Sequence, residues 1–340
     1  MAKETTIYDI AKELNISAAT VSRALKNSKL ISKSTTKKII DKAEELGYRH
    51  NSFASNLRKQ KSHTIGVLLH ELNSNFITSV LAGIEKVTTQ AGYDIIIAHS
   101  AEDYVKEVAN ATNLFHKRVD GVIASLSSNT KNLDHFRLFS EKKIPVIFFD
   151  RVDENSEETH VIIDNYRSGY LATQHLIEQQ CSNIVMLTAS LARNVYAQRH
   201  RGYMDALFDA GMKYNKNMVL VKDLSEKSAL DAANEILKMK PLPDGLFVTN
   251  DFIAAVCMQE LKRHGMRVPE DIAVVGFNND AISKIIEPQL TTINYPGRDM
   301  GEITARSLIN HLKGTGSINA TNRIIVKSEL IIRESSTRIK

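Results

Sequence analysis

The spacing of apolar residues near the N-terminus predicts two short helices joined by a tight turn. The first helix has an apolar stripe at positions i, i+3, i+4 and i+7, formed by Ile7, Ile10, Ala11 and Leu14. Ser17 is a suitable N-cap for a second helix, whose apolar stripe is Val21 and Leu25. Over residues 5–26 this pattern predicts a helix-turn-helix, in which the second helix enters the DNA major groove. An ordinary helical hairpin is the alternative.

A third helix is expected over residues 33–46, with Ser32 as its N-cap and Gly47 at its end. Its apolar stripe consists of Ile39, Ile40, Ala43 and Leu46. The next stretch, residues 50–62, is too short and too polar to be a stable helix alone in water. We interpret it as a linker that becomes helical only against a partner, and a plain tether is the alternative.

From residue 64 onward, short apolar runs rich in β-branched residues alternate with helical patterns, several of which end at a glycine. Runs that are apolar on both faces are typical of buried parallel strands. They occupy residues 64–69, 94–100, 119–125, 145–150, 161–164, 183–190, 217–221, 244–250 and 271–277. This alternation predicts an open α/β fold with parallel sheets, built as two similar halves that meet near residues 161–165.

Polar residues gather where the predicted strands end. They are His70, Asp150, Asp164, Arg193, Asn250, Asn278 and Asn279. The carboxyl ends of parallel strands meet at one edge of a sheet, and ligands of open α/β proteins bind outside that edge. We therefore expect a ligand site there. Two later segments should add a strand with a helix at 291–314 and a strand or strand pair at 323–336.

The positive charge of the chain is concentrated at its N-terminus. Residues 1–61 contain 13 Lys and Arg against 6 Asp and Glu, a net charge of +7, whereas the remaining residues carry −2. A basic module suits phosphate binding, because released counterions drive association. With 340 residues, 43% hydrophobic and 24% charged, the chain is large enough for two or more domains with a sizeable core.

Little in the sequence points to catalysis, a metal or a membrane. The chain lacks the G-x-S-x-G, H-E-x-x-H, P-loop and G-x-G-x-x-G motifs. Cys181 and Cys257 lie far apart without metal-ligand spacing, which suits a reducing cytosol. Neither an export signal nor a run of about 18 apolar residues is visible. We expect a cytoplasmic protein without catalytic residues, metal or cofactor.

These features occur together with the motifs of a known family. The chain resembles the LacI/GalR family of bacterial transcription regulators along essentially its whole length. The stretches that carry the resemblance include TIYDIAKELNISAATVSRAL, LGYRHNSFASNLR, PVIFFDR, QRHRGYMDAL, VTNDFIAAV, LKRHGMRVPEDIAVVGF and ELIIRESS. A helix-turn-helix alone is weak evidence, whereas this ordered set is specific.

The resemblance implies three parts. They are an all-α helix-turn-helix headpiece at residues 1–49, a hinge helix at residues 50–61, and a periplasmic-binding-protein-like effector-binding and dimerisation domain at residues 62–340. That domain is expected to have two α/β lobes, one of residues 62–161 and 292–322 and the other of residues 162–290 and 323–336. The family acts as a homodimer on double-stranded, pseudo-palindromic operator DNA.

The resemblance also implies a set of DNA contacts. The base-reading positions fall on Ala18, Ala19 and Arg23, and Arg23 can bond guanine with two hydrogen bonds. In the hinge, Leu57 is expected to wedge between base pairs in the minor groove, with Ala54 beside it. Phosphate-contacting or capping positions fall on Tyr8, Ser17, Thr20, Ser22, Ser32 and Thr35. Lys26 replaces the family's usual asparagine and is expected to contact phosphate.

The family's ligand positions correspond to Phe76, Asp150, Asp164, Arg199, Asn250 and Asn278, and His70 and Arg193 complete the expected effector site. Arginine, asparagine and carboxylates around a cleft suit hydroxyl-rich ligands. There are two departures, because Asn278 stands where the family often has Asp and Leu224 replaces an aromatic residue. For Asp150 and Asp164, structural bonding between the lobes is the alternative.

We therefore expect a sequence-specific transcriptional regulator that represses genes of carbohydrate uptake or catabolism. A sugar or sugar phosphate between the lobes would favour one lobe arrangement and so control DNA binding. A non-sugar effector such as a nucleobase, and a co-repressor-dependent or activating regulator, are alternatives. A solute-binding protein that feeds a transporter shares the two-lobed body, but it needs an export signal and no basic headpiece.

Overall fold

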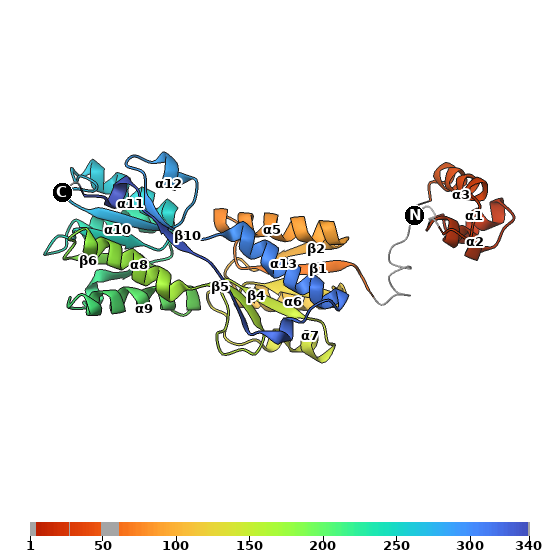
Figure 1. Cartoon of the computed structure of the whole chain (residues 1–340), viewed down its shortest axis with the longest axis horizontal. Helices are drawn as coiled ribbons and strands as arrows, with labels where there is room; N and C mark the ends of the chain where they lie inside the picture. Colours follow the sequence, from red (N-terminus) through yellow and green to blue (C-terminus); the bar gives the residue numbers. More distant parts are fainter. Residues whose placement is uncertain (1–4, 27, 49–60, 339–340) are drawn as a thin grey trace. The chain divides into compact units, whose positions relative to one another are not determined.

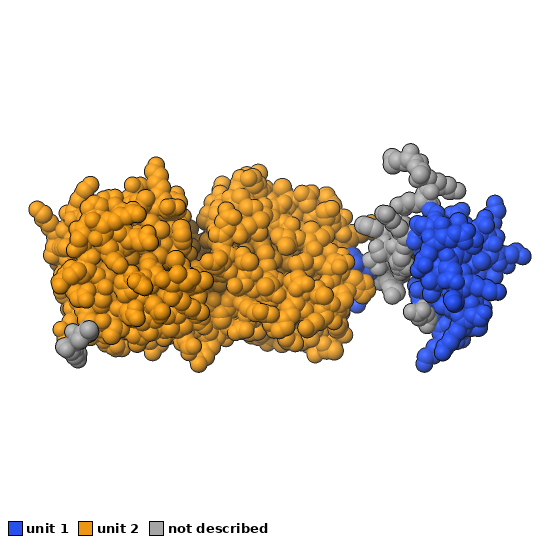
Figure 2. Space-filling view, turned by 90° about the horizontal axis from the view of Figure 1, so that it is seen from above, with its two compact units in different colours: residues 1–62 blue, residues 63–340 orange. Residues whose placement is uncertain are grey.

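The computed structural model describes residues 5–26, 28–48 and 61–338 and divides the chain into two compact units, residues 1–62 and residues 63–340 (Figures 1 and 2). Within these described ranges, the first unit holds three helices, and the second holds two six-stranded sheets with their covering helices. Within the described ranges, no helix combines the length and the apolar character needed to cross a membrane.

The three helices predicted near the N-terminus are confirmed. They are α1 (Ile7–Glu13), α2 (Ala18–Ala24) and α3 (Lys33–Glu45). Each begins after a hydroxyl N-cap, since Thr6, Ser17 and Ser32 all accept a hydrogen bond from a backbone N–H of the first turn. Their apolar stripes meet in a small core, in which Ile10, Val21, Ala24 and Ile39 are fully buried.

The first sheet of the second unit is parallel throughout, with the strand order β11-β5-β4-β3-β1-β2. Its strands are β1 (Thr64–Leu69), β2 (Asp94–His99), β3 (Gly121–Ala124), β4 (Val146–Phe149), β5 (Thr159–Ile163) and β11 (Arg323–Val326). Its helices are α5 (Asn75–Ala91), α6 (Tyr104–His116), α7 (Arg137–Glu141) and α13 (Gly297–Lys313), with short 3-10 turns at Asp134–Phe136 and Ile318–Ala320. We call this half the first lobe.

The second sheet has the order β12-β10-β9-β8-β6-β7 and is parallel except for β12, which runs antiparallel to β10. Its strands are β6 (Ile184–Thr188), β7 (Val219–Val221), β8 (Gly245–Val248), β9 (Ala273–Asn278), β10 (Thr291–Asn294) and β12 (Glu329–Ile331). Its helices are α8 (Asn165–Glu178), α9 (Asn194–Asp209), α10 (Glu226–Ile236), α11 (Asp251–Arg263) and α12 (Ile282–Ile285), with 3-10 turns at Lys216–Met218 and Glu334–Ser336. We call this half the second lobe.

Helices cover both faces of each sheet, as the two-sided apolar runs predict (Figure 1). In the first lobe, Val67 and Leu69 face α5 and α13, while Leu68 faces α6. In the second lobe, one face of the sheet packs against α8 and α9 and the other against α10 and α11. The cluster beneath α5 and α13 continues into the cluster beneath α8 and α9, so one apolar core spans both lobes.

The chain passes between the lobes three times, and the predicted lobe boundaries need correction. Strand β11 pairs with β5 in the first lobe, although residues 323–336 were assigned to the second. Strand β10 pairs with β9 in the second lobe, although the first lobe was expected to resume at residue 292. Both β11 and β12 are short and apolar, so the sequence pattern predicts strands there, but it does not specify which sheet edge each strand completes.

Close packing of α8 on α9 depends on glycine. A Cβ atom at Gly169 would lie 2.2 Å from the backbone oxygen of Arg199, and one at Gly202 would lie 2.2 Å from that of Tyr166. No side chain fits at these distances, so the two helix backbones touch directly. This contact fixes the position of Arg199, one of the predicted ligand residues, relative to α8.

Gly169→Ala should therefore destabilise the second lobe. The added methyl group forces the two helices apart, and we expect a loss of about 1–3 kcal/mol in the free energy of unfolding despite the better helix propensity of alanine. Gly316→Ala is the matched control, because its Cβ would meet nothing closer than 3.4 Å. Denaturant titration measures both, and equal stabilities for the two variants would contradict the packing argument.

Candidate DNA-binding face and inter-lobe ligand site

Helix α2 presents one exposed face. Val21 and Ala24 are buried in the three-helix core, whereas Ala19, Arg23 and Lys26 are exposed on the opposite side. Ala18 and Ser22 are half-buried. The spacing of 19 and 23 places these two side chains on one face of α2, which is the geometry that a helix entering the major groove requires, and Lys26 follows in the turn after the helix ends at Ala24.

The polar residues around α2 and α3 act as helix caps. Ser17 Oγ accepts from the backbone N–H of Thr20 at 3.1 Å, and Ser32 Oγ accepts from that of Thr35 at the same distance. Each pair of hydroxyls is also 2.8 Å apart. Ser17 and Ser32 therefore act as N-caps. The phosphate contacts expected of them stay a prediction. The Tyr8 side chain is 72% exposed on α1 and is available for such a contact.

Two of the predicted DNA-binding residues, Ala54 and Leu57, lie outside the described residues, as does nearly all of the predicted hinge.

Asp150 lies in the cleft at the carboxyl end of β4. Its φ of +59° is in the left-handed region, which aspartate tolerates better than most residues. Its backbone oxygen accepts from Asn194 Nδ2 of the second lobe at 3.0 Å, and its carboxylate accepts from the Tyr295 hydroxyl at 2.5 Å. In this structure Asp150 therefore makes structural bonds between the lobes, as the alternative to a ligand role expects.

Arg199 is buried in the second lobe, with 3% of its surface exposed. Its guanidinium carbon lies 3.6 Å from the ring centre of Phe277, and Nε donates to Asn165 Oδ1 at 2.9 Å. Nη1 points toward the backbone oxygen of Thr249 at 3.4 Å. Among the described residues no carboxylate forms an ion pair with Arg199, and burial lowers the pKa of its guanidinium. A ligand with hydroxyl or carboxylate oxygens would improve its bonding.

Tyr295 is the central residue of a buried cluster between the lobes, with 5% of its surface exposed. This residue was not predicted from the sequence. Its ring stacks on Phe76 with 4.0 Å between ring centres and meets Phe277 edge-on at 5.8 Å. Arg199 lies 5.4 Å from the same ring. The available signal was its place directly after β10, at the carboxyl edge where the other polar residues gather. The structure thus brings the predicted Phe76, Asp150 and Arg199 together around Tyr295.

The other predicted ligand residues have structural partners. Asp164 and Asn250 are the N-caps of α8 and α11, and Asn278 Nδ2 lies 3.3 Å from Asp280 Oδ2. Asn278 has a φ of +121°, a strained conformation at the end of β9. His70 is buried at the end of β1, with Nδ1 2.9 Å from Ser125 Oγ.

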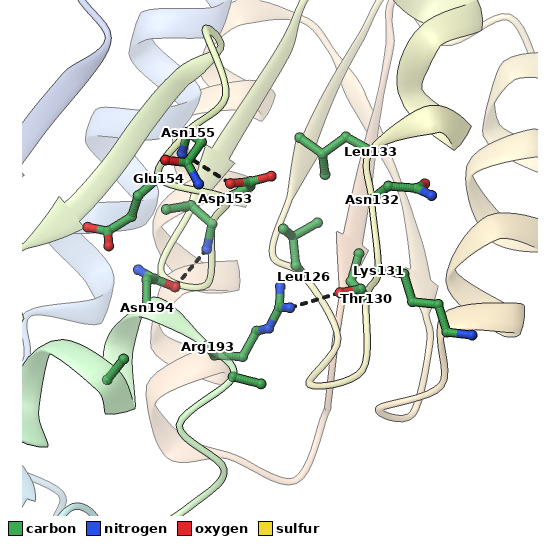
Figure 3. A pocket seen from close by; sticks show the side chains of 13 residues that line it. Leu126, Thr130, Lys131, Asn132, Leu133, Asp153, Glu154, Asn155, Arg193 and Asn194 are labelled. Atoms are coloured by element: carbon green, nitrogen blue, oxygen red, sulfur yellow. Dashed lines mark hydrogen bonds between the residues drawn. The ribbon is translucent and has the colours of Figure 1, made fainter.

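A pocket of about 270 Å³ opens between the lobes beside this cluster (Figure 3). Its walls are residues 126, 130–133 and 152–155 of the first lobe and residues 192–194 and 197 of the second. Arg193 crosses from the second lobe, and its Nη2 donates to the backbone oxygen of Thr130 at 2.8 Å. Its Nε is buried without a hydrogen-bond partner among the described residues, and burial lowers the pKa of the side chain. Amides and charges line the pocket, so it suits a polar ligand.

Glu107 holds the pocket wall in place. This carboxylate is fully buried, accepts from the backbone N–H of Ser127 at 2.6 Å and from the Thr130 hydroxyl at 2.9 Å, and lies 3.1 Å from His135 Nε2. Burial raises the pKa of Glu107, but the contacts with His135, Ser127 and Thr130 outweigh it, and the pKa lies below its ordinary value of 4.5. The loop that receives Arg193 is therefore fixed by an ionised carboxylate.

Glu107→Gln should cost about 1–3 kcal/mol of stability at neutral pH, the usual penalty for unbalancing a buried hydrogen-bonded charge. Because the folded pKa is lowered, the stabilisation by Glu107 is complete above pH 4.5 and is lost as the pH falls below it. The difference between wild type and variant should thus shrink in acid. Glu141→Gln, with a largely exposed side chain, is the control. Urea titrations at several pH values measure both, and a pH-independent difference would refute the ionised state.

Comparison with known proteins follows the same division of the chain. Residues 6–51 match a family model described as bacterial regulatory proteins, lacI family. Residues 173–336 match a model described as a periplasmic binding protein-like domain. The predicted fold class, a helix-turn-helix unit followed by a two-lobed α/β body, is confirmed.

Two relatives cover nearly the whole chain. The HTH-type transcriptional regulator RegA of Clostridium saccharobutylicum is 32% identical over 98% of this chain and 99% of its own length. The HTH-type transcriptional repressor PurR of Photobacterium profundum is 30% identical over 97% of this chain and 98% of its own length. The chain belongs to the LacI family. The predicted resemblance is confirmed, and this LacI-family chain is similar along its length to transcriptional regulators.

Solved structures of the family have the same fold. The transcriptional regulator CelR in complex with cellobiose is 26% identical, with a TM-score of 0.72 over 98% of this chain and 100% of that chain. The lac repressor dimer bound to operator and the anti-inducer ONPF has a TM-score of 0.86 at 24% identity, over 99% of this chain and 100% of that chain. At this identity the lac repressor match shows the fold alone.

Proposed function

We propose that this LacI-family chain is a transcriptional repressor that binds a pseudo-palindromic operator as a homodimer and responds to a carbohydrate bound between its lobes. The observation that carries the proposal is the exposed face of α2, where Ala19 and Arg23 project from a basic three-helix unit. A solute-binding protein or an enzyme has no use for such a face. Residues 50–61 would form the hinge helix, with Ala54 and Leu57 on the minor groove.

The chemistry of the cleft supports a carbohydrate effector. Asp150, Arg199 and Phe76 offer a carboxylate acceptor, a guanidinium donor and an aromatic face, and a sugar ring presents hydroxyls and an apolar face to match them. The CelR structure named for its cellobiose complex is in agreement. A non-sugar effector is the second candidate, because Asn278 and Leu224 depart from the family pattern.

Exposed apolar side chains support self-association. Phe252 on α11 is 47% exposed and Ile285 on α12 is 74% exposed, and Ile285 lines a surface hollow together with Ile282 and Ile286 and with polar side chains of α11. Apolar patches of this kind on a folded protein mark interaction sites. The lac repressor structure of the same fold is a dimer bound to its operator. A monomer without DNA affinity, found by size exclusion and gel shift, would overturn the proposed function.

The operator is predicted from α2. Ala18 and Ala19 offer only methyl contacts, which pack on thymine, while Arg23 reads a guanine. Selection from random duplexes with the purified full-length protein should give half-sites with A·T pairs beneath the alanines around a central C-G step, similar to TGTAAnCGnTTACA. Arg23→Ala should relax one guanine position by about 1–3 kcal/mol. Lys29→Ala, at an exposed cation beyond α2, should leave the consensus intact.

A consensus without the central C-G step, or with G·C pairs beneath the alanines, would show that α2 does not read bases in this way.

The effector site is tested by Arg199→Lys. Lysine keeps the charge but loses the planar fork, so we expect at least a tenfold loss of effector affinity with operator affinity unchanged. A thermal-shift screen of mono- and disaccharides and their phosphates identifies the ligand through its stabilisation, RT ln(1 + [L]/Kd). Calorimetry then compares Arg199→Lys with Arg201→Lys, an exposed neighbour on α9. Equal affinities in the two variants would remove Arg199 from the site.

A further inference from the structure

Tyr295 belongs to the segment that passes from β10 of the second lobe to α13 of the first. Its backbone bonds both lobes, since its N–H donates to the backbone oxygen of Asn278 at 3.3 Å and its carbonyl accepts from the N–H of Gly297, the first residue of α13, at 2.8 Å. Its side chain stacks on Phe76 and bonds Asp150 in the first lobe, and it meets Phe277 in the second. A movement of one lobe against the other would therefore break contacts of this ring.

The ring of Tyr295 also packs between apolar residues of the two lobes. Phe76 belongs to the first lobe and Phe277 to the second, and Tyr295 touches both. Only 5% of Tyr295 is exposed, and burial raises the pKa of its hydroxyl well above the ordinary value, so the hydroxyl remains a hydrogen-bond donor. Tyr295, Phe76 and Phe277 all belong to the one apolar cluster that spans both lobes.

The contacts of Tyr295 are those that the proposed function assigns to an effector. Phe76 receives a ring face, Asp150 accepts a hydroxyl hydrogen, and Arg199 lies 5.4 Å from the ring. The side chain of Tyr295 itself therefore makes both the aromatic stacking on Phe76 and the hydrogen bond to the buried carboxylate of Asp150.

We propose that Tyr295 is an internal occupant of the effector cleft, which holds the lobes together when no effector is bound. The effector is then a molecule with a ring face and a hydroxyl donor that takes over the contacts with Phe76 and Asp150. This inference rests on the proposed function, which identifies this region as the effector site. The experiment measures the arrangement of the lobes without DNA or effector, so its outcome does not depend on the proposed function.

The lobes have other links, so the loss of Tyr295 should shift their equilibrium without abolishing closure. Asn194 bonds the backbone of Asp150 and Val152, and Arg193 bonds that of Thr130. A hydrogen bond to a charged acceptor corresponds to about a tenfold change in an equilibrium constant. We expect a shift of about that size for Tyr295→Phe and a larger one for Tyr295→Ala.

The experiment places spin labels on the full-length chain at Lys142→Cys in the first lobe and Lys213→Cys in the second, both exposed positions. The native Cys181 and Cys257 are buried, and burial raises the pKa of each thiol to about 12, so they do not compete for the label. Dilution with unlabelled chain isolates the distance within one copy. The variants are Tyr295→Phe and Tyr295→Ala.

The matched control is Tyr203→Phe. Tyr203 is 1% exposed and donates its hydroxyl to the backbone oxygen of Ile184 at 2.8 Å, entirely within the second lobe. Its loss removes a buried tyrosine bond without touching the cleft. The Tyr295 variants should populate a second label distance that wild type and Tyr203→Phe lack. An unchanged distribution in Tyr295→Phe and Tyr295→Ala, or the same change in Tyr203→Phe, would overturn the proposal.

Chemical rescue tests the occupant directly. The probe is 4-methylphenol, the side chain of tyrosine, and at millimolar concentration it should restore the wild-type distance in Tyr295→Ala while leaving wild type unchanged. Toluene has the ring but lacks the hydroxyl donor, so it should rescue at least tenfold more weakly because Asp150 stays unpaired. Failure of 4-methylphenol, or equal rescue by toluene, would refute the assigned contacts.

Discussion

The arrangement of polar residues between the two lobes depends on one constraint, the parallel direction of the strands in each sheet. In both sheets all strands but β12 run the same way, so their carboxyl ends converge on one edge of each lobe. The chain must cross back to begin the next parallel strand, through a covering helix in most cases and through the loop of residues 150–158 between β4 and β5, so the polar residues at the strand ends stay at that edge. Asp150 after β4, Asn278 at the end of β9 and Tyr295 after β10 lie at this edge for that one topological reason.

Polar side chains at that edge are buried, and burial without a partner is costly. The first lobe satisfies them with a network, in which Arg151 Nη1 lies 2.5 Å from Glu102 Oε1 and Glu107 bonds the loop at 127–130. In the second lobe Asp251 is fully buried, and burial raises its pKa to about 7, although the Thr292 hydroxyl and the backbone N–H of Asp280 bond it. Of these bonds, the one from the Thr130 hydroxyl to Glu107 holds a residue of the pocket wall in place.

The sequence was sufficient to predict the elements but not all of their partners. Periodicity and caps predicted α1 to α3, and two-sided apolar runs predicted the parallel strands, because both patterns report local burial. Strands β10 and β11 each join the sheet edge that is free in the folded chain. A short apolar run such as RIIV predicts a strand, but it does not specify which sheet that strand joins. In the cleft, Phe76, Asp150 and Arg199 were predicted from the resemblance and come together in the structure. Tyr295 was missed because its role depends on reaching Asp150, 145 residues earlier in the chain.

The contacts of Tyr295 also determine which way an effector can act. A ligand that binds both lobe arrangements equally shifts nothing, however tightly it binds. A ligand that displaces Tyr295 removes a link between the lobes, and it restores closure only if it bonds the second lobe through Arg199 as well as the first through Phe76 and Asp150. A ligand that reaches only Phe76 and Asp150 leaves the guanidinium of Arg199 with its bonds to Asn165 and Thr249, and it therefore favours separation. If Tyr295 occupies the effector site as we propose, the sign of the response is set by whether the effector reaches Arg199, which is a property of ligand size and hydroxyl placement rather than of affinity.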